Sequence, residues 1–108
     1  MEKIKYNKLV RDGIPDLLKE QGKSFSTGVL NDKEYSIKLQ EALVEEMECF
    51  VESRHDKLAG DIADLLEIIY AIAEQRGITE PEIEFTRQMK KKQLGGYGKK
   101  LIIEPAGG

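Results

Sequence analysis

The sequence predicts a mainly α-helical protein, an antiparallel bundle of about four helices with a minor pair of short strands. Apolar residues recur at helical spacing through two long segments in the middle of the chain. Residues that favour helix starts and ends bracket these segments and two shorter ones. The length of 108 residues is typical of one domain, so residues 1–108 are predicted to fold as a single unit around a shallow core.

A short helix is predicted at residues 14–21, because Pro15 suits a first helical turn and Gly22 suits the position just after a helix. Residues 25–30 alternate loosely between apolar and small or polar side chains, which is typical of a short strand. The apolar run near residues 100–104 indicates a second strand. We expect these two strands to pair.

The first long helix is predicted at about residues 32–53, capped by Asn31 or Asp32. When its residues are placed at 100° intervals, apolar side chains cover one side and a stripe of Glu and Lys covers the other. Glu46 is the exception, since it falls among apolar residues on the side that should be buried. This position makes Glu46 a candidate functional residue.

The second long helix is predicted at about residues 57–75 and is apolar around much of its girth, which implies burial on several sides. Asp61 and Asp64 interrupt this apolar pattern. A last helix is predicted from Thr79 to about Gln93, because Thr-Glu-Pro-Glu combines a capping residue, a first-turn proline and a glutamate at capping-box spacing.

The acids on apolar faces indicate a metal site, because burying a carboxylate is costly unless it is paired or binds metal. Asp61 and Asp64 share one face of their helix, and a short turn makes the two long helices antiparallel neighbours. Glu45 and Glu46 are therefore expected to converge with them. Hard oxygen ligands without a nearby basic partner favour Mg²⁺, or Mn²⁺, over zinc. For Glu45 and Glu48 a solvated position on the helix surface is the alternative.

Charge is unevenly distributed along the chain. Residues 31–84 contain 15 acidic and 5 basic residues, whereas the segments on either side carry more basic than acidic residues. An acidic centre with basic ends suits a metal and a polyphosphate if the ends fold over the centre; a solvated helix face with a basic tail is the alternative. The candidate phosphate-binding residues are Lys8, Arg11, Lys38, Arg87, Lys90, Lys91 and Lys92. For Lys38 a surface pair with Glu34 or Glu41 is the alternative.

Composition favours a cytoplasmic protein. The single cysteine, Cys49, cannot form an intrachain disulfide. The first residues lack the apolar stretch of a signal peptide, and no apolar run is long enough to span a bilayer, so no membrane partner is expected. Net acidity and the lack of a reading-helix motif disfavour nucleic-acid binding. A thin core makes oligomerisation plausible.

Several stretches resemble a known family. Tyr6-Asn-Lys-Leu-Val-Arg-Asp-Gly-Ile-Pro15 resembles the YNKLVRDKIP opening of a group of small MazG-like proteins. The likeness continues in Glu45-Glu-Met-Glu-Cys-Phe50, in residues 61–71 and in residues 92–97, and so spans nearly the whole chain. The group belongs to the all-α nucleoside triphosphate pyrophosphohydrolases, alongside MazG and phosphoribosyl-ATP pyrophosphohydrolase. The resemblance implies a MazG-like helical bundle.

The metal motif of this superfamily is E-E-x-x-E on one helix and E-x-x-D on the next. Two residues depart from it: Cys49 stands where the third glutamate belongs, and Asp61 replaces a glutamate. Glu48 lies one residue away from the third position and is its candidate substitute. The metal ligands that the resemblance implies are Glu45, Glu46, Glu48, Asp61 and Asp64.

The resemblance implies Mg²⁺-dependent hydrolysis between the α- and β-phosphates of a nucleoside triphosphate, often in the clearance of non-standard nucleotides. Glu45 and Glu46 are its expected catalytic residues, with Glu45 orienting the attacking water. Members of the family are usually dimers or tetramers with sites near subunit contacts. The alternatives are a non-catalytic nucleotide-binding or regulatory dimer, which Cys49 favours, and hydrolysis of another phosphoanhydride such as phosphoribosyl-ATP.

Overall fold

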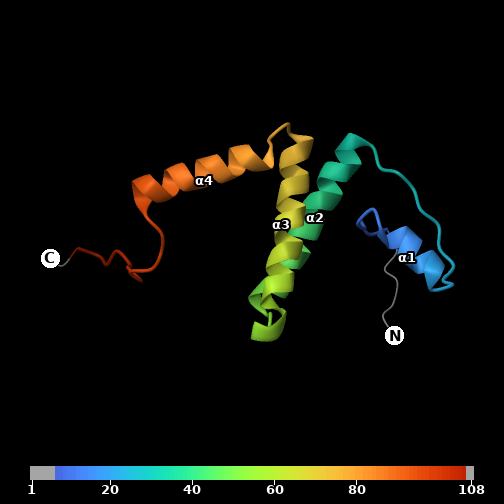
Figure 1. The fold of residues 1–108 in the computed structure, drawn as a ribbon, viewed down its shortest axis with the longest axis horizontal. Coiled ribbons are helices and arrows are strands. Elements are labelled where there is room, and N and C mark those ends of the chain that lie inside the picture. The colour runs from blue at the N-terminus through green and yellow to red at the C-terminus, as the bar shows by residue number, and fades with distance from the viewer. Residues whose placement is uncertain (1–6, 107–108) are drawn as a thin grey trace.

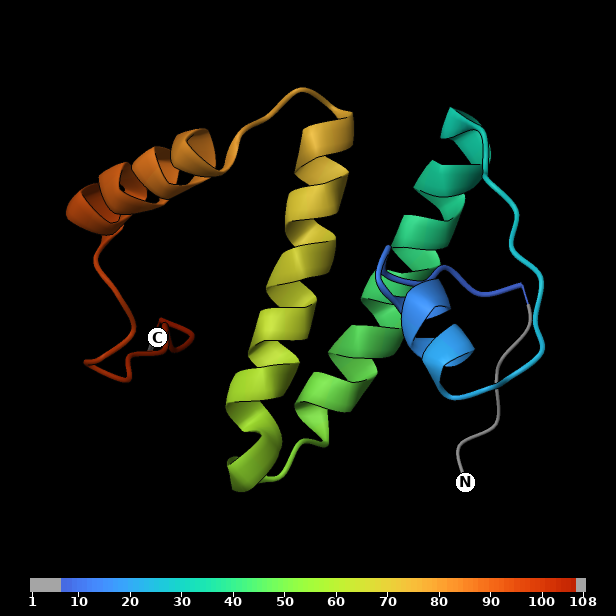
Figure 2. The ribbon, with the colours of Figure 1, turned by 45° about the vertical axis from the view of Figure 1, so that its right-hand side comes forward.

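The helices predicted from local signals are all present in the computed structural model, which describes residues 7–106. They are α1 (Ile14–Glu20), α2 (Asp32–Val51), the 3₁₀ turn η1 (His55–Lys57), α3 (Leu58–Gln75) and α4 (Glu80–Leu94). Figures 1 and 2 show α2 and α3 side by side as an antiparallel hairpin, with α1 beside α2 and α4 projecting away from the end of α3. The predicted antiparallel pairing of the two long helices is therefore confirmed.

Capping boxes explain where α2 and α4 begin. The Asn31 side chain accepts a hydrogen bond from the Glu34 backbone N–H at 2.8 Å, and the Asn31 N–H donates in return to the Glu34 carboxylate. Thr79 and Glu82 form the same reciprocal pair at the start of α4. Each pair satisfies backbone amides that the first helical turn leaves without partners. The capping box predicted at Thr79 is confirmed, and Asn31 rather than Asp32 caps α2.

Glycines with positive φ terminate α1 and α3. Gly22 has φ of 72° and Gly77 has φ of 76°, values that residues with a Cβ rarely adopt. After α3 the Gly77 N–H donates to the Glu74 carbonyl and the Ile78 N–H donates to the Ala73 carbonyl, at 3.0 and 2.9 Å. This pattern is a Schellman motif, which satisfies the last carbonyls of the helix. The predicted helix ends at these glycines are confirmed.

The small hydrophobic core of the described chain lies between α2 and α3. Leu39 on α2 and Ala73 on α3 are the buried hydrophobic residues of the described chain, at 2% and 8% exposure. At the open end of the hairpin the Ser36 hydroxyl donates to the Gln75 side-chain carbonyl, and the Gln75 amide donates to the Asp32 carbonyl, both at 2.9 Å. These bonds fix the two helices in register where no loop joins them.

The described chain is too extended to bury its apolar residues alone. Its radius of gyration is 18.7 Å, whereas a compact domain of this length has about 13 Å. Its accessible surface is 10013 Å², against roughly 6,000 Å² expected for a folded monomer of this mass. Extensive helix–helix packing among residues 7–106 is confined to α2 and α3. The predicted thin core is confirmed.

One side of the hairpin exposes a continuous row of apolar side chains. On each helix these residues recur at helical spacing, so they share a face. We call this surface the apolar face: Ile37, Val44, Met47 and Val51 on α2, with Ile62, Leu66 and Ile69 on α3. Their exposure ranges from 37% at Ile69 to 82% at Val51. Patches of this extent on a soluble domain usually mark an interaction site.

The predicted strand pair does not form among residues 7–106. Residues 25–30 and 101–106 carry no regular secondary structure, and Val29 and Ile103 are fully exposed. Figure 1 shows the physical reason, because the two segments lie at opposite ends of the molecule and cannot reach each other. Within the described part of the chain, no helix is long and apolar enough to cross a membrane.

Candidate metal centre

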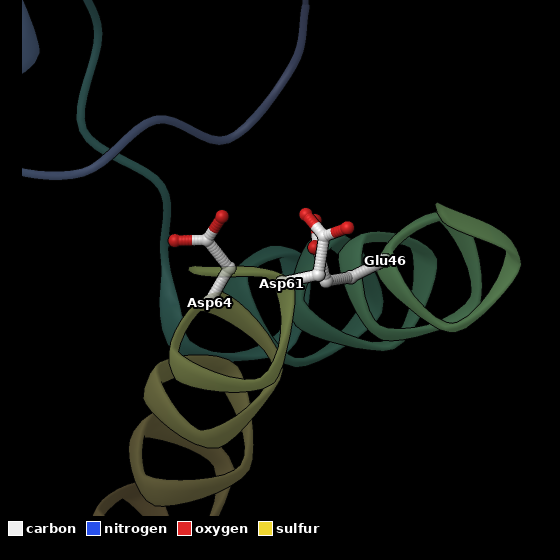
Figure 3. A group of neighbouring side chains, drawn as sticks. All are labelled: Glu46, Asp61 and Asp64. Carbon is white, nitrogen blue, oxygen red and sulfur yellow. The ribbon is translucent and has the colours of Figure 1, made fainter. Parts of the chain in front are cut away.

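Three carboxylates converge between the long helices near their connecting turn. Glu46 of α2 and Asp61 and Asp64 of α3 each place an oxygen within 4.8 Å of the others. Figure 3 shows the three side chains pointing to one side of the hairpin. Asp61 and Asp64 share a face because they are three residues apart, and the hairpin packing brings Glu46 opposite them. Glu46 and Asp61 are half-buried, whereas Asp64 is exposed. We call these three residues the acidic trio.

The environment of Glu46 disfavours its charged form. Partial burial raises the pKa of the Glu46 carboxyl above its ordinary value, and the negative charges of Asp64 and Asp61 raise it further. Lys8 and Arg11 act in the opposite direction and lower the pKa. The net shift is upward, so the trio concentrates negative charge that a bound cation would relieve.

Basic residues of the N-terminal segment lie against this cluster. The Lys8 Nζ atom is 2.6 Å from the Glu45 Oε2 atom, and the Arg11 Nη2 atom donates to the Asp64 Oδ1 atom at 3.0 Å. Both come from a segment without regular secondary structure that precedes α1. The Ile14 N–H donates to the Arg11 carbonyl at 3.0 Å and closes the turn into α1. Lys8 and Arg11 therefore lie against the acids, as expected if this basic end folds over the acidic centre. The expectation that the acids have no basic partner nearby is wrong.

A groove of about 1060 Å³ runs between the N-terminal segment and the hairpin. Residues 8–12 form one wall, and α2 and α3 form the other. Glu46 and Asp64 lie in it together with two half-buried aromatic residues, Tyr35 and Tyr70. The groove thus joins an acidic region to an aromatic one. Tyr6, which opens the motif noted above, lies outside the described residues.

Sequence reasoning placed Tyr35 on the buried side of its helix and gave Tyr70 no role. Helical spacing identifies Tyr35, because Tyr35 and Glu46 are eleven residues apart, three turns along one face of α2. Tyr70 is six residues from Asp64 on α3 and therefore lies on a different face of the helix. Only the tertiary structure places Tyr70 in the groove.

The acidic trio fits Mg²⁺ or Mn²⁺. Its donors are all carboxylate oxygens, and the group contains neither His nor Cys, the ligands that favour zinc. Mg²⁺ takes six oxygen ligands at about 2.0–2.1 Å and usually keeps several waters. Three oxygens within 4.8 Å of one another can close on one such ion by small side-chain rotations. The remaining positions are left for water or phosphate oxygens.

The other predicted ligands lie nearby but outside the trio. Glu45 and Glu48 are exposed and line the groove, as does Cys49. Glu45 pairs with Lys8. Lys38 pairs with Glu41 at 3.2 Å, which is the surface interaction considered above as the alternative to a phosphate contact.

The structure does not bring the basic residues of α4 to the acids within one chain. Arg87 Nε donates to Glu84 Oε2 on the same helix at 2.9 Å, and this bond lowers the pKa of Glu84 to about 2. Lys90 and Lys91 are exposed on the same helix. Both ribbon views show α4 standing apart from α1 and α2. The expectation that this basic end folds over the acidic centre fails here, because Gly77 turns the chain away from the hairpin.

The raised pKa of Glu46 predicts a pH dependence of stability in the absence of metal. Because the folded protein holds this proton more tightly than the unfolded chain, the stability contribution is present below pH 4.5 and is lost as pH rises through the folded pKa. With EDTA present, the wild-type melting temperature should therefore fall relative to that of Glu46→Gln as pH increases from about 4 to 7. Parallel melting curves for the two proteins across this range would contradict the prediction.

In comparisons with known proteins, no protein-family model, no curated protein and no solved structure matches this chain. The function is therefore inferred from the site itself. Its principal features are the acidic trio, the cations of the N-terminal segment and the groove with its two tyrosines.

Proposed function

We propose that the protein is a Mg²⁺-dependent nucleoside triphosphate pyrophosphohydrolase that releases a nucleoside monophosphate and pyrophosphate. One observation carries this proposal: three carboxylates converge, and two of them, Glu46 and Asp64, line a groove that also presents Lys8 and Arg11. A metal-binding cluster beside fixed cations suits a polyphosphate, whose oxygens bind both. The sequence resemblance to MazG-like proteins supports the same reaction.

Each residue of the cluster has a role in this proposal. Glu46, Asp61 and Asp64 hold Mg²⁺, with Mn²⁺ as a substitute. When bound, the ion offsets charge on the phosphates and lowers the pKa of a bound water. Glu45, at the edge of the trio, accepts a proton from the attacking water and orients it. Arg11 and Lys8 bind phosphate oxygens.

The aromatic part of the groove is the proposed position of the nucleoside. Tyr70 lies six residues beyond Asp64, which is about 9 Å along the helix axis. This separation suits a ligand whose phosphates contact the acids while its base reaches an aromatic ring. Stacking on Tyr35 or Tyr70 would accept any base, in keeping with a role in clearing non-standard nucleotides.

A homodimer, or a tetramer built from it, completes the proposal. The accessible surface exceeds that of a compact monomer by roughly 4,000 Å², which is more than the roughly 1,000–2,500 Å² that each partner buries in an obligate dimer. The apolar face is the surface proposed for the second copy. Arg87, Lys90 and Lys91 would contact a triphosphate from another subunit. No membrane or nucleic-acid partner is proposed, and the expected compartment is the cytoplasm.

The direct test is to measure pyrophosphate release from canonical, deoxy and modified nucleoside triphosphates, with Mg²⁺, with Mn²⁺ and with EDTA. We expect metal-dependent release with nucleoside monophosphate as the only other product. Release of orthophosphate instead would replace the proposed reaction with hydrolysis at the γ-phosphate. No metal-dependent product from any substrate would contradict the enzymatic proposal.

The alternative is a nucleotide-binding protein without catalytic activity, and Cys49 is the residue that favours it. Cys49 lines the groove at the position where the related motif has a third glutamate. If the site has lost a ligand, Cys49→Glu should raise both Mn²⁺ affinity and turnover by about tenfold or more. We expect a change of less than threefold, because the trio already supplies three ligands. Cys49→Gln, which adds similar bulk without charge, is the matched control.

A further inference from the structure

Two side-chain cations occupy the acidic cluster where a metal and a phosphate are proposed to bind. The Arg11 Nη2 atom forms an ion pair at 3.0 Å with the Oδ1 atom of Asp64, a member of the acidic trio. The Lys8 Nζ atom forms an ion pair at 2.6 Å with the Oε2 atom of the neighbouring Glu45. Like charges repel strongly at such separations. A divalent ion bound to the trio would therefore oppose the present positions of both cations.

The charges involved are matched. Lys8 and Arg11 together bring two positive charges to the four carboxylates of Glu45, Glu46, Asp61 and Asp64, and one divalent ion brings the same charge. Either arrangement neutralises the cluster to the same extent. Exchange between them therefore leaves the local net charge unchanged. Having both in place would bring the cluster to neutrality, so the short distance between like charges, and not the net charge, opposes the two arrangements together.

The structure also allows the two side chains to move. The side chains of Lys8 and Arg11 are 40% and 59% exposed, and ion pairs with this exposure are weak. Their segment has no helix or strand to unfold when they reorient. Leu9, which lies between them in sequence, is half-buried and lines a pocket together with Ala42 of α2. The side chains can therefore leave the carboxylates without release of the segment.

We propose that Lys8 and Arg11 are exchangeable counterions, which neutralise the acidic cluster in the metal-free protein and transfer to the phosphates of the substrate when a divalent ion takes the carboxylates. This inference rests on the function proposed above. Arginine is well suited to the transfer, because its guanidinium binds a carboxylate or a phosphate with the same paired donors. The metal alone then binds weakly, and a triphosphate strengthens metal binding by giving the displaced cations new partners.

A purely structural role makes the opposite prediction. If Lys8 and Arg11 only brace the N-terminal segment, removing them loosens the groove and weakens binding of metal and of triphosphate together. If they are exchangeable counterions, their removal strengthens binding of the metal alone and weakens binding of the triphosphate. The two roles therefore predict opposite changes in the affinity for the metal alone when Lys8 and Arg11 are removed.

The test is Mn²⁺ binding, followed through the electron paramagnetic resonance of the free ion, in the wild type and in Lys8→Gln/Arg11→Gln. We expect the double variant to bind Mn²⁺ alone about fivefold more tightly, since two exposed ion pairs no longer compete. We expect inorganic tripolyphosphate to tighten Mn²⁺ binding in the wild type by at least about tenfold, and by much less in the double variant. Arg11→Lys keeps the charge but loses the paired donors, so it should bind Mn²⁺ alone like the wild type and gain less affinity from tripolyphosphate.

The matched control is Lys19→Gln/Lys23→Gln, which removes the same charge from the neighbouring part of the chain and should leave Mn²⁺ affinity within twofold of the wild type. Far-UV circular dichroism establishes that each variant is folded. Weaker or unchanged Mn²⁺ binding by folded Lys8→Gln/Arg11→Gln would overturn the exchange while leaving the proposed reaction intact. Failure of the wild type to bind Mn²⁺ at all would overturn both.

Discussion

Glu46→Gln is expected to lower metal-dependent hydrolysis by about 100-fold or more and, in the same protein, to raise the melting temperature measured in EDTA. The loss follows because the variant removes one of three charged ligands, and metal-borne charge stabilisation is worth several kcal/mol. The gain follows because burial and the charges of Asp64 and Asp61 disfavour the ionised carboxyl in the metal-free protein. Glutamine keeps the shape of the side chain without its charge.

Steady-state kinetics at saturating Mg²⁺ and thermal unfolding in EDTA measure the two effects. Glu20→Gln, at the exposed end of α1, is the matched control, and we expect it to change neither quantity appreciably. A Glu46→Gln protein that retains wild-type turnover would remove Glu46 from the metal site. A lower melting temperature in EDTA would show that the ionised carboxyl stabilises the fold, although burial and the charges of Asp64 and Asp61 disfavour it.

Leu66→Lys is expected to dissociate the protein and to unfold most of it at micromolar concentration. Leu66 lies in the middle of the α3 part of the apolar face and is 41% exposed in the single chain. If a second copy covers this face, the substitution buries an unpaired ammonium group, which costs several kcal/mol. Because Leu39 and Ala73 are the only buried hydrophobic residues among residues 7–106 of a single chain, little other packing remains to offset the loss.

Sedimentation equilibrium gives the mass, and circular dichroism gives the helical content, of the same samples. Gln93→Lys is the control, because it adds the same charge to an exposed polar position of α4, on a different helix from the apolar face. We expect that variant to keep the mass and helicity of the wild type. A folded Leu66→Lys protein of unchanged mass would show that subunits associate through another surface.

The helices were predictable because their boundaries depend on interactions within a few residues. Asn31 and Thr79 cap helices through contacts with residues three positions on, and Gly77 ends one through its own backbone conformation. The absence of the predicted strand pair could not be foreseen from such local signals. Pairing requires residues 25–30 and 100–104 to meet across the whole chain, and the course of α4 keeps them apart.

The candidate site likewise has some features that the sequence predicts and others that depend on tertiary packing. The apolar surroundings of Glu46 and the three-residue spacing of Asp61 and Asp64 marked these acids in the sequence as able to share one point. The predicted ligands also included Glu45 and Glu48, and the rotation of α2 about its axis as it packs on α3 decides that Glu46 meets the two aspartates. Spacing also could not place Tyr70 in the groove, since an aromatic residue on an apolar helix is equally compatible with a core position.

Local chemistry within the chain thus sets the number of helices, their limits and the acids able to share one point. Packing between distant segments decides the rest: which carboxylates meet, which cations lie against them and which apolar residues stay uncovered. The N-terminal segment crosses to the hairpin and brings Arg11 to Asp64, fifty-three positions away in sequence, whereas the bend at Gly77 carries Arg87 away. Residues 1–30 and residues 85–108 each contain six basic residues, so the path of the backbone distinguishes the cations beside the acids from those outside the site.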